Sequence, residues 1–317
     1  MKPTIVLVHG AFAESTSWNS VIDLLTNAGH PVIAAANPLR DMATDAASIG
    51  DLTRSIEGPV VLVAHSYGGA VISNVPADAG EIITLVYVNG FAPDPGESCF
   101  SLAGLFPGST LGNDTLWPVP RSDGTTDLYI IRDRFHELFG ADVPAPEAAR
   151  MAATQRPATQ EALFAPSGGR PLWRELPSWF VVGEEDRIIP AELQRFMAER
   201  AGARRTLEIP GASHGARCLS APDDGGPDPG GRGAARGLLT TTPREESKMA
   251  ITTRTAVVLE RASQEFVDAT STPPFLYELT PSPARWASRA ESASEWARRM
   301  PRSITCRRRA PSATRRA

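Results

Sequence analysis

Short runs of aliphatic residues recur along the first two thirds of the chain, separated by polar stretches with helical periodicity. The runs are rich in β-branched residues and lack alternation, which is typical of strands covered on both faces of a parallel sheet. Six strands are predicted, at Thr4–Val8, Pro31–Ala36, Pro59–Ala64, Ile82–Val88, Ser178–Val182 and Arg205–Ile209. Helices are predicted between them, at Ser17–Ala28, Thr44–Ile56, Gly69–Ala77 and Ala191–Ala201. Strands that alternate with helices indicate a doubly wound α/β fold with right-handed crossovers.

One interval interrupts this alternation. Between about Pro93 and Pro177 the sequence shows no clear strand, yet it is rich in aromatic residues: Phe100, Phe106, Trp117, Tyr129, Phe135, Phe139, Phe164 and Trp173. An interval of roughly 85 residues is too long for a plain loop. We therefore predict a helical cap over one edge of the sheet, formed by residues 93–177. The α/β core would then comprise residues 1–92 and 178–221.

The charge is distributed unevenly along the chain. Residues 1–215 carry 15 Lys and Arg against 25 Asp and Glu, a net charge of −10, whereas residues 216–317 carry 17 against 11, a net charge of +6. The second stretch contains a Gly- and Pro-rich linker at 223–231, where no packed element is expected. We expect residues 222–317 to be a basic tail of low order. A reading-frame shift or a gene fusion would explain the change of character.

The composition argues against several classes of protein. The chain has 317 residues, of which 42% are hydrophobic and 21% charged, as in ordinary globular proteins. No run approaches the roughly 18 apolar residues of a transmembrane helix, and the N-terminus has no signal-peptide h-region. Three scattered cysteines and a net charge of −4 argue against disulfides, a zinc site and nucleic-acid binding. We expect a cytoplasmic monomer or homodimer with no metal and no membrane partner.

A predicted strand-to-helix turn carries the first candidate for chemistry, in the run Ala64-His65-Ser66-Tyr67-Gly68. A sharp turn here would lift the serine oxygen above the sheet, at a helix N-terminus where backbone N–H groups favour a developing anion. Small flanking residues let the backbones approach closely, and Ala64 stands where the usual motif has glycine. His65 is expected to point away from the serine, because neighbours on the turn diverge. A serine in a tight turn without chemistry is the alternative.

The loop after the first strand, His9-Gly10-Ala11-Phe12, is expected to face this turn. Both follow the carboxyl ends of parallel strands, where the sites of open α/β sheets lie. The backbone N–H groups of Ala11 and Tyr67 would then point at a common oxyanion, an arrangement that strongly lowers barriers to acyl transfer. Taken alone, the loop is equally compatible with an ordinary turn that needs glycine.

Two further strand ends supply an acid and a base. Of the three carboxylates in Glu184-Glu185-Asp186, Asp186 is the best placed to hold a histidine N–H and stabilise an imidazolium, although a helix-capping role would also suit it. His214 directly follows the last predicted strand. The chain order Ser66, Asp186, His214 matches the order used by one large fold of hydrolases. We therefore predict a catalytic triad.

These motifs resemble the α/β-hydrolase superfamily over about residues 3–215. The segments VLVHGAF, AHSYGGAV, FAPDPGES, GEEDRIIP and GASH are similar to one branch, which contains small bacterial carboxylesterases, pyrethroid-type hydrolases, and plant methylesterases and hydroxynitrile lyases. The resemblance implies a helical cap after the fourth strand. In the hydroxynitrile lyases a threonine replaces Gly10 and a lysine follows the histidine, so Gly10 and Gly215 are the esterase pattern. The final helix of family members has no counterpart directly after the histidine here.

The resemblance implies a serine carboxylesterase that hydrolyses small to medium apolar esters through an acyl-enzyme intermediate and needs no cofactor. Ser66 would attack the ester carbonyl while His214 removes its proton, and Asp186 would orient His214. Aromatic residues of the cap predict an apolar pocket for the small-molecule substrate, although packing inside the cap is the alternative for many of them. The candidate substrate contacts are Phe12, Trp117 and Phe135.

Other functions are compatible with the same sequence. A ligand-binding receptor with an idle triad is the alternative from another class, because a fold does not determine a function. Among enzymes, a cofactor-free perhydrolase or a C–C bond hydrolase would use the same serine machinery. The complete set of triad residues favours the esterase.

Overall fold

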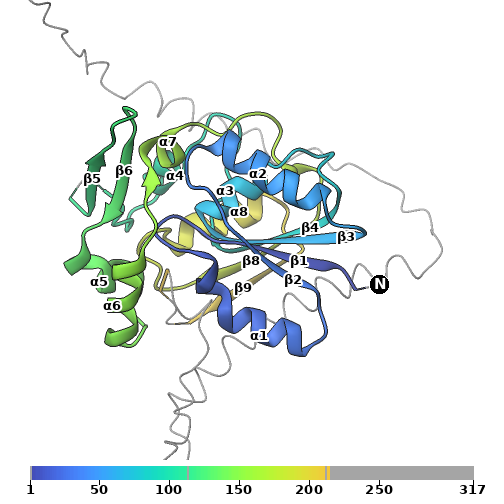
Figure 1. The fold of residues 1–317 in the computed structure, drawn as a ribbon, viewed down its shortest axis with the longest axis horizontal. Coiled ribbons are helices and arrows are strands. Elements are labelled where there is room, and N and C mark those ends of the chain that lie inside the picture. Colours follow the sequence, from blue (N-terminus) through green and yellow to red (C-terminus); the bar gives the residue numbers. More distant parts are fainter. Residues whose placement is uncertain (1, 113, 211–212, 215–317) are drawn as a thin grey trace, which may run out of the picture. The chain divides into compact units, whose positions relative to one another are not determined.

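The structure is a computed structural model that describes residues 2–112, 114–210 and 213–214. Its centre is a sheet of six parallel strands in the order β2-β1-β3-β4-β8-β9 (Figure 1). The strands are β1 (Thr4–Val8), β2 (Val32–Ala35), β3 (Pro59–Ser66), β4 (Glu81–Gly90), β8 (Ser178–Gly183) and β9 (Arg205–Ile209). All six predicted strands are present, with ends that differ from the prediction by at most two residues. The predicted tail, 222–317, lies outside the described residues.

Helices cover both faces of this sheet. The helix α1 packs on one face, together with the 3-10 turn η1, and α2, α3 and α8 pack on the other (Figure 1). Their bounds are η1 (Ser15–Trp18), α1 (Asn19–Asn27), α2 (Met42–Arg54), α3 (Tyr67–Ser73) and α8 (Ala191–Arg200). Since both faces are covered, every residue of β3 after Pro59 is buried, which explains why the strand sequence shows no alternation. None of the described helices is long and apolar enough to cross a membrane.

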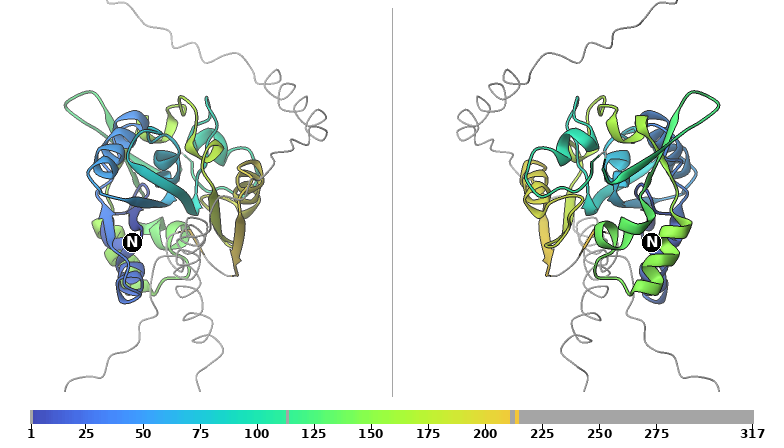
Figure 2. Two further views of the ribbon diagram at one scale, coloured as in Figure 1. Left: turned by 90° about the vertical axis from the view of Figure 1, so that its right-hand side faces the viewer. Right: turned by 90° about the vertical axis from the view of Figure 1, so that its left-hand side faces the viewer.

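The cap contains a small sheet as well as helices. Its elements are α4 (Cys99–Ala103), β5 (Leu116–Pro120), β6 (Thr126–Ile130), η2 (Arg132–Arg134), α5 (Phe135–Phe139), α6 (Ala145–Thr154), β7 (Ala158–Thr159), α7 (Gln160–Phe164) and η3 (Leu172–Arg174). The strands β5, β6 and β7 pair antiparallel in that order. The expectation that this interval has no strand was therefore wrong. Pro118 and Pro120 hide β5 in the sequence, and the structure accommodates them because β5 is an edge strand; Figure 2 shows its hairpin with β6 at the periphery.

The segment that follows β2 attaches the cap to the core. The backbone N–H of Thr159 donates to Leu39 O at 3.1 Å. The guanidinium of Arg40 contacts an Asp127 carboxylate oxygen at 2.9 Å and Pro157 O at 3.0 Å. These bonds join β6 and β7 of the cap to the carboxyl edge of the parallel sheet, where the candidate site lies.

Candidate active site

Ser66 stands at the junction of β3 and α3, as the sequence predicts. Its backbone has φ 54° and ψ −126°, a conformation that is strained for a residue with a side chain and that persists only where its surroundings enforce it. Strain of this kind is concentrated at functional sites. The side chain is almost fully buried, with 5% of the residue exposed.

Glycines at neighbouring positions allow the loops to approach Ser66. A Cβ atom added to Gly10 would lie 2.5 Å from Ser66 Cβ, and one added to Gly68 would lie 2.6 Å from Val8 O. Neither distance is possible without a shift of the backbone. Ala64, which departs from the usual glycine, is fully buried in β3. The loop after β1 and the turn after β3 are therefore in direct contact, as expected from the sequence.

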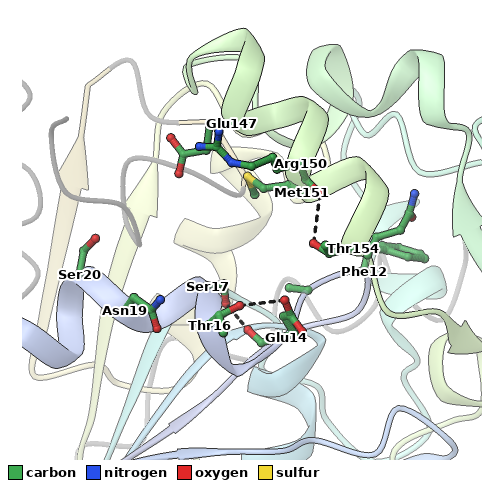
Figure 3. Close-up of a pocket in the computed structure, with 12 residues that line it drawn as sticks. Phe12, Glu14, Thr16, Ser17, Asn19, Ser20, Glu147, Arg150, Met151 and Thr154 are labelled. Carbon is green, nitrogen blue, oxygen red and sulfur yellow. Dashed lines mark hydrogen bonds between the residues drawn. The ribbon is translucent and has the colours of Figure 1, made fainter. Parts of the chain in front are cut away.

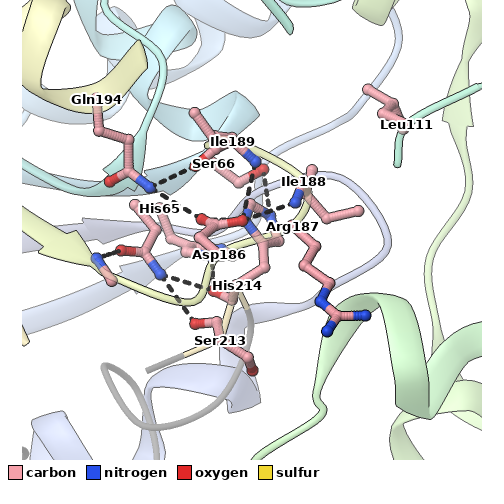
Figure 4. A network of polar contacts seen from close by, with 12 residues as sticks. His65, Ser66, Leu111, Asp186, Arg187, Ile188, Ile189, Gln194, Ser213 and His214 are labelled. Carbon is pink, nitrogen blue, oxygen red and sulfur yellow. Dashed lines mark hydrogen bonds and ion pairs between the residues drawn. The ribbon is translucent and has the colours of Figure 1, made fainter. Parts of the chain in front are cut away.

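The structure brings Ser66, His214 and Asp186 together (Figure 4). His214 Nε2 lies 3.0 Å from Ser66 Oγ, and His214 Nδ1 lies 2.9 Å from Asp186 Oδ2. Because an ionised carboxylate only accepts hydrogen bonds, Nδ1 carries the proton of a neutral imidazole and Nε2 is the acceptor for the serine hydroxyl. This arrangement can remove a proton from Ser66 and deliver it to a leaving group.

Asp186 lies in a cage of hydrogen-bond donors. Its Oδ1 accepts the backbone N–H groups of Ile188 and Ile189, both at 2.8 Å, and its Oδ2 accepts Gln194 Nε2 at 3.0 Å (Figure 4). The neighbouring Glu184 and Glu185 are exposed, so Asp186 is the buried carboxylate of the three candidates. Gln194, which lies in the first turn of α8, stands in no motif of the sequence.

Two side chains of the core hold the loop that carries His214. Asn89 Nδ2 donates to Ser213 O at 3.0 Å, and its Oδ1 accepts the Gly183 N–H at 2.7 Å. His65 Nε2 donates to His214 O at 2.8 Å, and the two imidazole rings lie 4.7 Å apart. Burial, followed by the His214 ring, lowers the pKa of His65 well below its usual value. A neutral His65 therefore holds the backbone carbonyl of His214 and packs against its ring, a role that the sequence did not reveal.

The cap also reaches the imidazole of His214. The ring of Phe139 lies 5.1 Å from it in an edge-on arrangement, and Phe135 packs against Phe139 at 5.0 Å. The carboxylate of Asp142 accepts a hydrogen bond from the hydroxyl of Ser213. Phe135, a predicted substrate contact, is fully buried, so its observed contacts are those of a residue in the cap's core. The sequence did not separate Phe139 from the other cap aromatics.

The two predicted oxyanion donors belong to the two segments that meet at Ser66, the turn into α3 and the loop after β1. Tyr67 is the first residue of α3, where backbone N–H groups have no intrahelical acceptor. Ala11 lies in the loop after β1, and its N–H has no acceptor among the described residues. The next N–H, that of Phe12, donates instead to Arg156 O of the cap at 3.0 Å.

A cavity of about 310 Å³ lies beside the loop after β1, between the start of α1 and the cap helix α6 (Figure 3). Phe12 and Met151 give it apolar surface, while Glu14 and Arg150 make it partly polar. Ser66 and His214 are not part of its lining.

Of the three predicted substrate contacts, Phe12 thus borders a cavity. Trp117 is 59% exposed on the β5–β6 hairpin, with its ring 5.5 Å from Tyr129, and its substrate role stays a prediction.

Comparison with known proteins agrees with this architecture. A model of the alpha/beta hydrolase family matches residues 5–225, so the chain belongs to the alpha/beta hydrolase family. A pyrethroid hydrolase of Sphingobium wenxiniae is 28% identical over 229 residues, which cover 66% of this chain and 80% of that protein. A carbendazim hydrolyzing esterase of a Nocardioides species is 36% identical over 111 residues, 31% of this chain and 46% of the esterase.

A solved structure gives the same fold. The crystal structure of polyneuridine aldehyde esterase superposes with a TM-score of 0.57 at 20% identity, covering 68% of this chain and 92% of that one. The predicted fold class is therefore confirmed. The prediction that the chain is an enzyme of the hydrolase and esterase class is also confirmed, since the relatives described above are named hydrolases and esterases.

Proposed function

We propose that the chain is a serine carboxylesterase that hydrolyses small to medium apolar esters through an acyl-enzyme. The observation that carries this proposal is a chain of two hydrogen bonds. His214 Nε2 lies 3.0 Å from Ser66 Oγ, and His214 Nδ1 lies 2.9 Å from Asp186 Oδ2. A serine hydroxyl is a weak nucleophile at neutral pH and needs an adjacent base. The relatives named pyrethroid hydrolase and carbendazim hydrolyzing esterase support the assignment.

In the first half of the reaction, Ser66 Oγ attacks the ester carbonyl and its proton passes to His214 Nε2. Asp186 stabilises the imidazolium and keeps the ring in the required orientation. The N–H groups of Ala11 and Tyr67 stabilise the oxyanion of the tetrahedral intermediate. The intermediate collapses as the imidazolium gives its proton to the departing alkoxide, leaving the acyl group on Ser66.

In the second half, His214 takes a proton from a water molecule, which attacks the acyl carbonyl. The second tetrahedral intermediate uses the same oxyanion donors. Its collapse returns the proton to Ser66 Oγ and releases the carboxylic acid. The same five groups, which are Ser66, His214, Asp186 and the N–H groups of Ala11 and Tyr67, therefore act in both halves, and only the ester and one water molecule are needed besides them to balance the reaction.

The test is hydrolysis of p-nitrophenyl acetate, butyrate and octanoate by the wild type and by Ser66→Ala. Loss of the nucleophile should lower kcat by about 10³-fold or more, because only weak residual catalysis survives removal of a triad member. Ser178→Ala is a matched control: Ser178 is also buried, at 1% exposure, and its Oγ has no hydrogen-bond partner in the described part of the chain. This control should hydrolyse all three esters as the wild type does.

Two results would overturn the proposal. Equal hydrolysis by the wild type and Ser66→Ala would show that another group does the chemistry. A folded wild type that hydrolyses none of the three esters would favour the ligand-binding receptor. A preference for one chain length would in addition give the size of the acyl site.

A further inference from the structure

The residue that follows the nucleophile is held by its side chain as well as by its backbone. Tyr67 is fully buried, and its hydroxyl donates to Asp45 Oδ2 at 2.7 Å. Hydrogen bonds to an ionised oxygen are about twice as strong as those between neutral groups. The proposed mechanism uses only the backbone N–H of Tyr67, so this buried bond has no part in it.

Asp45 is itself fixed in position. It lies in α2 and is fully buried, and its two carboxylate oxygens accept the backbone N–H of Arg40 at 3.0 and 3.1 Å. Burial raises the pKa of Asp45, while the hydrogen bonds from Arg40 and Tyr67 oppose this effect. The side chain of Arg40 then continues to the cap through Asp127 and Pro157. Asp45 thus connects the nucleophile turn to the segment after β2, which contacts the cap.

The strained backbone at Ser66 gives the hydrogen bond between Tyr67 and Asp45 a role in the orientation of the Tyr67 N–H. A backbone with φ 54° at a residue with a side chain relaxes unless neighbouring contacts prevent it. Rotation of the peptide unit between Ser66 and Tyr67 would relieve strain, but it would also turn the Tyr67 N–H away from the oxyanion. Anchoring the side chain of Tyr67 at its far end resists this rotation.

We propose that Asp45 and the hydroxyl of Tyr67 are positioning groups that aim the Tyr67 N–H at the oxyanion. The inference rests on the proposed esterase function. The two groups touch no reacting atom. They act through the backbone of Tyr67, so their loss misplaces an oxyanion donor that remains present.

A second buried tyrosine provides a matched control. Tyr87 is also fully buried, and its hydroxyl contacts Ser73 Oγ at 2.9 Å, at the other end of α3. Tyr67→Phe and Tyr87→Phe each remove one hydroxyl that connects α3 to the core. Only Tyr67 contributes a backbone N–H next to the nucleophile.

The experiment measures kcat and KM for p-nitrophenyl butyrate, and inhibition by phenylboronic acid, which forms a tetrahedral adduct on a serine. Removal of an oxyanion donor costs about 10²–10³ in kcat. Misplacing one donor by Tyr67→Phe should cost less, about 10-fold to 100-fold in kcat, and should leave KM within about twofold of the wild-type value. The inhibition constant of phenylboronic acid should rise by a factor similar to the loss in kcat. Tyr87→Phe should keep the wild-type values of all three.

Asp45→Ala, which removes both acceptor oxygens, provides an independent route, and it replaces Tyr67→Phe should that variant fail to fold by circular dichroism. Both substitutions break the same bond, so the double variant should lose little more than the more damaging single variant. An additive loss would overturn the coupling of the two residues. Equal losses in Tyr67→Phe and Tyr87→Phe would also overturn the inference, since they would reflect only the stability of α3.

The outcomes separate this inference from the esterase proposal. Loss of activity in Ser66→Ala with wild-type kcat in Tyr67→Phe and Asp45→Ala overturns the positioning role alone. Retained activity in Ser66→Ala overturns the esterase mechanism, and the positioning role with it.

Discussion

The ring of Phe139 meets the imidazole of His214 edge-on, with ring centroids 5.1 Å apart and an angle of 78° between their planes. The same ring lies 6.2 Å from His65. A cap residue therefore closes one side of the imidazole with apolar surface. This contact keeps water from that side and limits the orientations that the His214 ring can take.

We predict that Phe139→Ala lowers both stability and activity. Deletion of a buried aromatic ring costs about 3–5 kcal/mol, and the space left beside His214 would free its ring. We expect kcat/KM for p-nitrophenyl esters to fall about tenfold or more. Phe139→Leu, which keeps most of the apolar contact, should retain more of both properties. Wild-type kcat/KM in a folded Phe139→Ala variant would contradict this role.

The residues at strand ends could be predicted from the sequence because their signal is local. A buried apolar run locates a strand within a few residues, and parallel strands bring their carboxyl ends to one edge of the sheet. Ser66, Asp186 and His214 each follow such a run. To predict that these three side chains meet, it was therefore enough to know the order of the strands along the chain and that the strands run parallel.

The remaining parts of the site depend on contacts that leave no local pattern. Asn89 directly follows the predicted strand Ile82–Val88 but stands in no catalytic motif, and Phe139 looks like one more aromatic residue of the cap. Only the tertiary fold places Asn89 beside Ser213, 124 positions further along the chain. The hairpin of β5 was missed for a different reason, since Pro118 is a negative signal for a strand unless the strand is known to be at an edge.

We predict that Gly10→Ala abolishes most of the activity. The added methyl would lie 2.5 Å from Ser66 Cβ and 3.0 Å from His65 O, so either the nucleophile or the loop with Ala11 must move. Overpacking of this kind costs about 1–3 kcal/mol of stability, and kcat should fall at least about 100-fold. Gly168→Ala is the control, because no atom lies within 4 Å of the added carbon. Equal activities of the two variants would show that the close contact has no role.

We predict that the amide of Gln194 supports Asp186 as a donor. Gln194→Met keeps the volume but removes the 3.0 Å bond to Oδ2, while the two backbone donors to Oδ1 remain. Loss of a hydrogen bond to a charged group costs about 1.5–3 kcal/mol, to be measured by urea unfolding, and we expect less than about a tenfold loss of kcat/KM.

Gln194→Glu should be more damaging at neutral pH, because it places a second carboxylate beside Asp186 and like charges repel. As the pH falls, the introduced carboxyl becomes protonated and can again donate to Asp186. The activity of this variant relative to the wild type should therefore rise as the pH is lowered. A Gln194→Glu variant that is more active than Gln194→Met at pH 8 would refute the argument.

We predict that stability falls as the pH drops from about 6.5 to 4, the interval between the unfolded and folded pKa values of His9. His9 is fully buried, donates from Nδ1 to Gly10 O at 2.9 Å and accepts the Asn37 N–H at Nε2 at 3.2 Å. Burial lowers its pKa to about 4, against about 6.5 in an unfolded chain. In this interval the unfolded state binds a proton that the folded state does not, so the unfolding free energy decreases with falling pH.

The shift at His9 corresponds to about 3 kcal/mol, present in full above pH 6.5 and lost as the pH approaches 4. His65 acts in the same direction, since burial also lowers its pKa. Asp45 has the opposite effect at the low-pH end of this range. Because burial raises its pKa, the folded state binds its proton more readily than the unfolded state, which increases stability as the pH falls. Urea unfolding between pH 7 and pH 4 measures the slope, and His9→Asn should flatten it while lowering stability at pH 7. If His9→Asn reduces stability by the same amount at every pH, protonation of His9 is not the cause of the slope.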